Sequence, residues 1–152
     1  MSLKYNKVPL VCFLAITIFS LALLGYTLYI TLGTKWALSS LSVSLSPVKI
    51  NENMSTADFP LVICNPSNMR LAIFYLKAEI KFNNTDIGIE ELNFQYQLLE
   101  LQTNVKTNVT VTIPVDNQTS YSNGIWSLEL RLILDTSLPK QSSINRVLSY
   151  GG

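Results

Sequence analysis

The sequence predicts an all-β fold, a Greek-key-like antiparallel β-sandwich of six to seven strands, behind one N-terminal transmembrane α-helix. Three observations lead to this prediction. Residues 8–32 form one long apolar run, later segments alternate apolar with polar side chains, and turns rich in Asn, Ser, Asp and Pro separate those segments. A period of two is the pattern of a half-buried strand. Several short strands with polar turns between them are typical of a sandwich.

The apolar run over residues 8–32 is predicted to be a transmembrane helix. After Val8 and Pro9 it contains no charged residue and no Asn, Gln or Pro. At 1.5 Å per residue it is about 37 Å long, enough to cross a hydrocarbon core of roughly 30 Å. A secretory signal peptide is the competing interpretation, but its apolar region has only about 7–15 residues. We therefore expect a retained anchor in the lipid bilayer.

The residues that flank this helix predict its orientation. Lys4 and Lys7 precede it, whereas only Lys35 follows it closely. Basic residues are retained on the cytoplasmic side of a membrane. We expect a single-pass protein of the cell membrane with its N-terminus in the cytoplasm. Its parts are a cytoplasmic tail (1–7), the transmembrane helix (8–32), a linker (33–37) and an extracytoplasmic β-sandwich domain (38–152).

The expected strands follow from alternation. Residues 38–50 place Leu41, Val43 and Leu45 on one side and serines on the other. Residues 58–64 form a more continuously apolar strand, and residues 70–82 a long alternating one. Alternation continues over 87–98, over 109–115 beside Pro114, and over 125–134. The tail from residue 137 is predicted to be irregular apart from a last short strand around residues 144–148.

Composition argues against several functions. All ten acidic and nine of the eleven basic residues follow residue 32, so the outer domain is nearly neutral and lacks the basic footprint of nucleic-acid binding. The absence of His excludes His-ligated metal and a Ser-His-Asp triad within this chain. Glu90 and Glu91, with Asp86 or Glu100, suggest a cation site, but we expect a solvated turn instead. We expect no catalytic residue, no cofactor and no metal, and hence a protein that is not an enzyme.

Residues 59–67, FPLVICNPS, carry a resemblance to a known family. Followed by a long strand, the polar turn at 83–86 and Ile87-Gly88, they resemble the water-stress and hypersensitive-response (WHy) domain of group 2 late-embryogenesis-abundant proteins. That family shows an apolar strand ending in Asn-Pro-Asn, and here Ser67 follows Asn65 and Pro66. Segments 107–115 and 126–134 resemble its later strands. The resemblance covers about residues 38–135, implies a β-sandwich and carries over no catalytic residue. For Asn65-Pro66 we expect a turn whose Asn side chain caps local backbone groups.

Four asparagines stand in Asn-x-Ser/Thr sequons and are predicted glycosylation sites. They are Asn53, Asn83, Asn108 and Asn117. All four fall in predicted turns or beside strand ends. The low charge and the abundant hydroxyl and amide side chains are similar to those of envelope proteins of thermoacidophilic archaea. We therefore expect a glycoprotein of archaeal type.

The membrane helix also carries a stripe of small residues. Positions at spacings of three and four form one face with small side chains near its middle, whereas bulky residues such as Phe19 and Leu23 occupy other faces. Small side chains let another helix approach closely. We expect this face to contact protein; it comprises Ala15, Ile18, Ala22, Gly25 and Tyr29.

Two function classes follow from these features. The preferred one is a non-catalytic accessory or structural subunit of a multi-subunit membrane complex, such as an archaeal respiratory assembly. Its helix and its β-domain, packed on the outer face, would both contact other subunits. The alternative is a free-standing cell-surface binding module or filament subunit that uses exposed strand edges to capture partners.

Overall fold

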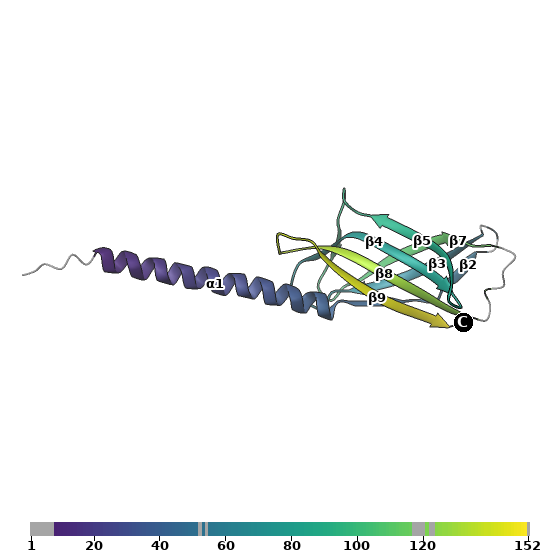
Figure 1. The fold of residues 1–152 in the computed structure, drawn as a ribbon, viewed down its shortest axis with the longest axis horizontal. Helices are drawn as coiled ribbons and strands as arrows, with labels where there is room; N and C mark the ends of the chain where they lie inside the picture. Colours follow the sequence, from purple (N-terminus) through teal and green to yellow (C-terminus); the bar gives the residue numbers. More distant parts are fainter. Residues whose placement is uncertain (1–7, 52, 54, 117–120, 122–123, 152) are drawn as a thin grey trace, which may run out of the picture.

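The computed structural model describes residues 8–51, 53, 55–116, 121 and 124–151. It contains one long helix, α1, and a sandwich of two antiparallel β-sheets (Figure 1). The predicted all-β sandwich behind a single helix is confirmed, with nine strands among the described residues. In chain order the elements are α1 (Val8–Ser40), β1 (Ser42–Leu45), β2 (Lys49–Asn51), β3 (Thr56–Cys64), β4 (Leu71–Phe82), β5 (Thr85–Asn93), β6 (Leu99–Leu101), β7 (Lys106–Pro114), β8 (Ile125–Thr136) and β9 (Ser142–Gly151).

The helix α1 continues past the apolar run and ends only at Ser40. Residues 33–37, predicted to be a linker, are therefore helical, and so is the start of the strand predicted from residue 38. Tertiary packing explains the difference. Thr34 and Ala37 are completely buried, and Leu41 directly after the helix is 3% exposed. The last turns of the helix are thus part of the domain's core, and helix and domain are joined without a linker.

The smaller sheet is built around β3, which pairs with β1 and β2 along one edge and with β7 along the other. The strand predicted over residues 38–50 is interrupted at residues 46–48. Pro47 lies in this interruption, and Pro60 of β3 lies opposite it. Neither proline can donate a backbone hydrogen bond, although the Pro60 carbonyl still accepts one from the Ser46 N–H (2.8 Å). The ladder breaks where its donors are missing.

The larger sheet is built around β4. This strand pairs with β8 on one side and with β5 and β6 on the other, and β9 lies beyond β8. Asn83 and Asn84 form the two-residue turn between β4 and β5 with positive φ angles of 49° and 66°, as a type I′ hairpin requires. The strand predicted over 87–98 ends at Asn93, and Tyr96 in the following loop is 95% exposed.

The tail predicted to be mostly irregular is the ten-residue edge strand β9, paired with β8 along its whole length. Ile144, Leu148 and Tyr150 pack against the core. Arg146 lies between Ile144 and Leu148 on the same face, opposite the buried Leu130. A charge within the apolar set weakens the alternation, which is why the sequence pattern shows only a short strand here.

The core lies between the inner faces of the two sheets (Figure 1). Its largest fully buried side chains come from β3, β4, β7 and β8 and are Phe59, Leu61, Ile63, Leu71, Ile73, Leu76, Ile80, Ile113, Leu128, Leu130, Leu132 and Leu134. An aromatic cluster closes the core at the end remote from α1. Trp126 lies at the centre of this cluster, with ring centroids 4.7 Å from Phe82, 5.1 Å from Phe59 and 5.2 Å from Tyr121.

Substituting Gly124 by alanine is expected to destabilise this end of the domain by about 1–3 kcal/mol, the usual cost of overpacking. A Cβ on Gly124 would lie 2.2 Å from the Phe82 ring, which is itself held in the aromatic cluster. Gly88→Ala is the matched control, because its Cβ would meet Ile113 at an ordinary 3.7 Å. Urea unfolding followed by tryptophan fluorescence, to which Trp126 contributes from within the core, measures both variants. Equal midpoints for the two variants would contradict the prediction.

Candidate functional site

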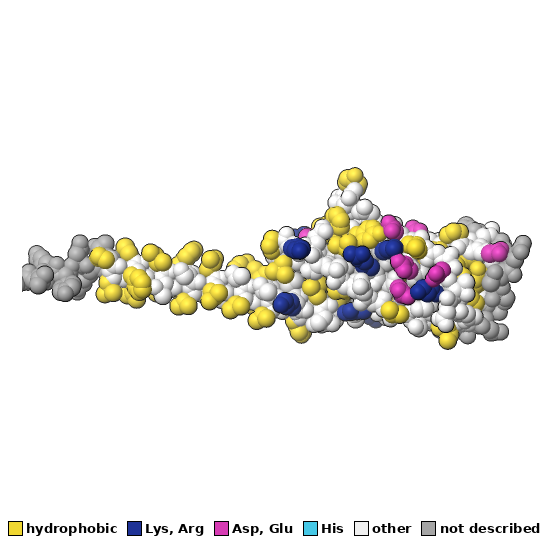
Figure 2. All heavy atoms as spheres, viewed as in Figure 1, with side chains coloured by type: hydrophobic (Ala, Val, Ile, Leu, Met, Phe, Trp, Pro, Cys, Tyr) yellow, Lys and Arg dark blue, Asp and Glu magenta, His cyan; other side chains and the backbone are white. Residues whose placement is uncertain are grey.

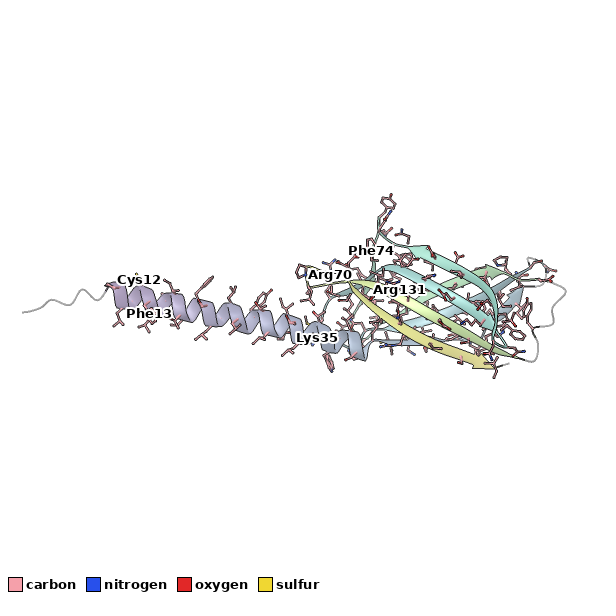
Figure 3. The ribbon with its side chains drawn as sticks, viewed as in Figure 1. Cys12, Phe13, Lys35, Arg70, Phe74 and Arg131 are labelled. Carbon is pink, nitrogen blue, oxygen red and sulfur yellow. The ribbon has the colours of Figure 1, made fainter. Side chains whose placement is uncertain are left out.

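The helix α1 is exposed over most of its length. Among the described residues it is the one helix long and apolar enough to cross a membrane, and the chain buries none of its most apolar stretch. Cys12 and Phe13 point away from the helix with no other segment against them (Figure 3). The hydroxyls of Thr17, Thr27 and Thr31 donate to the carbonyls four residues earlier at 2.8–2.9 Å. These polar groups are therefore satisfied within the helix, as an apolar surrounding demands.

The predicted contact face of the helix is among the exposed surfaces. Ile18 is 66% and Tyr29 is 65% exposed, and Ala15 and Ala22 are also exposed. Nothing in the described chain lies within 4 Å of the position that a Cβ on Gly25 would take. The structure thus places all five predicted residues on a surface that this chain leaves uncovered.

In contrast to these exposed helix residues, Asn65 is completely buried. Its amide nitrogen donates to the carbonyls of Met69 (3.0 Å) and Leu101 (3.2 Å). Its amide oxygen accepts from the backbone N–H (3.1 Å) and the hydroxyl (2.6 Å) of Ser67. The side chain therefore caps local backbone groups, as expected for the turn, and it also holds a strand that is distant in the sequence.

Ser67 extends this network in both directions. Its hydroxyl accepts from the Met69 N–H (3.3 Å), and its carbonyl accepts from the Thr103 hydroxyl (2.9 Å). The Asn65 carbonyl accepts from the Asn104 N–H (2.8 Å). The loop between β3 and β4 is thereby fastened to the loop between β6 and β7. Pro66 itself is exposed, so the turn built on Asn65 and Pro66 is structural.

The β3–β4 loop also contacts the helix. A Cβ on Gly33 would lie 2.9 Å from the Met69 sulfur. Met69 is two residues from Ser67, so the Asn65 network supports the surface on which α1 rests. We call this end of the domain the base; it comprises the last turns of α1, the loops at residues 65–70, 102–105 and 137–141, and the strand ends that adjoin these loops.

Three of the four predicted glycosylation sites can be placed. Asn53 and Asn83 are exposed in turns at the end remote from the base, and Asn108 is exposed within β7. The Asn83 side-chain oxygen accepts the Ile125 N–H (2.9 Å). Asn117 lies outside the described residues. All three asparagines that the structure describes are accessible from solvent.

The carboxylates considered as a cation site lie apart. Glu90 shares a face with the buried Ala78, whereas Glu91 points to the opposite face of β5. Glu100 pairs with Arg70 at 2.7 Å, and Asp86 lies 3.9 Å from Lys81. Across the described part of the chain, no group of three or more His, Cys, Asp or Glu side chains is placed to hold a metal ion.

The outer face of the larger sheet carries most of the ion pairs (Figure 2). Lys77 pairs with Glu79 at 2.8 Å and Lys81 with Glu129 at 2.6 Å. The hydrogen bond from Lys77 lowers the pKa of the Glu79 carboxyl, and the bond to Glu129 raises the pKa of the Lys81 ammonium group. All four side chains remain partly exposed. Such surface pairs contribute little stability, so this face is a solvated surface with mutually compensating charges.

Comparisons with known proteins give the fold a relative. No protein-family model matches the chain, and no curated protein matches its sequence. Among solved structures the chain is similar to a candidate late embryogenesis abundant protein, with a TM-score of 0.51 and 11% identity over 90% of this chain and 86% of that one. A protein from Archaeoglobus fulgidus is more distant, with a TM-score of 0.41 and 8% identity over 74% of this chain and 95% of that one. The β-sandwich thus has the fold of a late-embryogenesis-abundant-like domain.

Sequence reasoning missed two features of the domain. The first is the burial of Thr34 and Ala37, which joins helix to sandwich. The second is a set of lysines at the base, since Lys35, Lys106 and Lys140 are far apart in the sequence. Only the paired strands bring them to one end, and no local pattern could have indicated this.

Proposed function

We propose that this chain is a non-catalytic, single-pass accessory or structural subunit of a multi-subunit membrane complex. The observation that carries the proposal is the exposed helix face of Ala15, Ile18, Ala22, Gly25 and Tyr29, whose small side chains leave room for another helix. Within a bilayer, helices associate mainly through close van der Waals packing, which small residues permit. A helix that served only as an anchor would not need such a face.

The β-domain supplies the second contact in this proposal. Because α1 enters the core without a linker, a helix fixed against a partner also fixes the β-domain above that partner. The domain would then cover the outer face of the complex, with the N-terminus in the cytoplasm. We further propose that it is a WHy-like domain in an archaeal-type membrane protein, for which a respiratory assembly is one host. The late-embryogenesis-abundant-like fold and the weakly charged surface support this assignment.

The edge strands favour the subunit over the alternative of a binding module that adds a strand to its sheet. The larger sheet ends in β5 and the short β6 on one side and in β9 on the other. Glu90 on β5 and Arg146 on β9 both occupy positions on the core-facing side, opposite Ala78 and Leu130. Inward-pointing charges on edge strands are a common protection against further strand pairing.

The native size of the particle tests the proposal. The chain is extracted from its own membrane in mild detergent, the particle is sized, and the accompanying chains are identified by mass spectrometry. We expect a large particle of defined composition that contains this chain in a fixed ratio. A monodisperse monomer would count against the subunit, and a polymer of this chain alone would favour the filament.

Glycan analysis tests the proposed orientation. We expect native material to carry a glycan on at least one of Asn53, Asn83, Asn108 and Asn117, because an extracytoplasmic domain meets the glycosylation machinery and the three described sites are exposed. Peptide mass spectrometry before and after deglycosylation detects the modification. Uniformly unmodified peptides would remove this support for an outside location.

A further inference from the structure

Three lysines at the base have no carboxylate partner within the part of the chain that the structure describes. Lys35 lies on the last turns of α1, Lys140 lies in the loop between β8 and β9, and Lys106 begins β7. All three are exposed, and within the described residues none forms an ion pair. Figure 2 shows basic side chains where the apolar helix meets the domain, and Figure 3 locates Lys35 and Arg70 there.

The depth of the base relative to the membrane follows from where the apolar run of α1 ends. The apolar run ends at Leu32, and the next residue, Gly33, already contacts Met69 of the β3–β4 loop. If the helix spans the membrane, as the proposed function states, the base begins where the hydrocarbon ends and lies in the headgroup layer. Lys106 and Ser42 lie on either side of Cys64 in the smaller sheet and are therefore at the same height. Ser42 comes nine residues after Gly33. At 1.5 Å per residue, Lys106 is therefore the highest of the three lysines, roughly 13 Å above Gly33.

The charge of the domain is polarised along the same axis. At the base, Lys35, Lys106, Lys140 and Arg70 face two carboxylates, Glu100 and Asp135, which leaves an excess of two positive charges. Glu100 is already engaged by Arg70. The described residues at the remote end carry a smaller, opposite excess, with three acidic residues and two basic ones; these are Asp58, Asp86, Asp116, Lys49 and Lys81.

We propose that the base is a docking surface for anionic phospholipid headgroups, with Lys35, Lys106 and Lys140 as the binding side chains. A negatively charged membrane surface attracts basic residues within about one Debye length, roughly 10 Å at moderate salt. Trp36, 58% exposed beside Lys35, is suited to the same interface, where tryptophan is enriched.

Energy transfer from Trp36 to labelled lipid tests the proposal. The full chain is reconstituted in phosphatidylcholine nanodiscs with a low mole fraction of one pyrene-labelled phospholipid, which carries either a phosphatidylglycerol or a phosphatidylcholine headgroup on the same labelled chain. Trp126 lies in the core towards the remote end, so its energy transfer is expected to be the same for both probes. We expect local enrichment of the anionic probe by roughly two- to fivefold at low salt. The enrichment should vanish at 1 M salt, where the Debye length is about 3 Å.

Two charge-matched variants give the decisive comparison. Lys35→Gln, Lys106→Gln and Lys140→Gln together should abolish the preference. Lys49→Gln, Arg131→Gln and Arg146→Gln remove the same charge from elsewhere on the domain and should retain it. Equal transfer to both probes in the unaltered chain, or loss of the preference in the second variant, would overturn the docking surface. Absence of transfer to either probe would instead show that the helix does not enter the bilayer, which contradicts the proposed function itself.

Discussion

Replacing Ala22 and Gly25 together by leucine is expected to release the chain from the proposed membrane complex while the β-domain stays folded. Both residues lie on the exposed small-residue face, and nothing in the described chain contacts the space beside Gly25. Two leucine side chains would fill the space into which a partner helix must pack. Close packing is a main source of association within a bilayer, so we expect loss of co-purification rather than a graded weakening.

The control adds the same bulk to the other side of the helix. Ser20 and Thr27 are each two residues from a position on the small-residue face, which turns them about 200° around the axis. Ser20→Leu and Thr27→Leu should therefore leave co-purification unchanged. Far-ultraviolet circular dichroism of each purified variant checks that the sandwich is intact. If the Ala22 and Gly25 double variant still co-purifies, the helix is only an anchor and the β-domain makes the attachment.

Asn65→Ala is expected to destabilise the domain by about 3 kcal/mol or more, because it leaves several buried backbone groups without partners. The Asn65 side chain serves the carbonyls of Met69 and Leu101 as well as two donors of Ser67. These groups are enclosed by the loops of the base, so water replaces the lost bonds poorly. Urea unfolding of the full chain in detergent, followed by tryptophan fluorescence with Trp126 as the buried reporter, measures the loss.

Two further variants separate the amide from the mere presence of a polar residue. Asn65→Asp keeps the acceptor for Ser67 but places a second oxygen against the carbonyls of Met69 and Leu101, so we expect it to be at least as damaging as alanine. Asn83→Ala removes an asparagine from an exposed turn, where its side chain bonds to Ile125 and its φ is 49°; the lost bond and the left-handed backbone together should cost about 2 kcal/mol, less than Asn65→Ala. A stable Asn65→Asp variant would show that the two donor bonds are unimportant.

Sequence periodicity predicted the parts of this fold whose neighbours are regular. The strands β3, β4, β7 and β8 have uninterrupted apolar faces, and their alternation indicates them within a few residues. The break between β1 and β2 was not predicted, because it depends on Pro60 of β3 lying opposite the interruption at residues 46–48. Strand β9 was underestimated because Arg146 stands in its apolar set. The helical turns after Leu32 depend on the burial of Thr34 and Ala37 against the sandwich, which only the folded chain provides.

The candidate sites, too, could be predicted where they depend on residues close in sequence and not where they depend on distant ones. The helix face is local in sequence, since residues three and four apart share a side of a helix, and it could be predicted directly. The turn at Asn65 was expected from its Asn-Pro pair, but its bond to Leu101 spans 36 residues and could not be. The lysines of the base come from three distant segments, so their grouping required the paired strands.

The continuous helix has a mechanical consequence. If α1 spans the bilayer as proposed, its apolar segment of about 37 Å exceeds a hydrocarbon layer of roughly 30 Å, and a tilt of the helix accommodates that difference. Since α1 continues unbroken to Ser40 and buries Thr34 and Ala37 in the domain, the sandwich leans with the helix. The angle between the domain and the membrane plane would then depend on bilayer thickness. A thinner membrane swings the acidic end sideways, and a thicker one brings it upright.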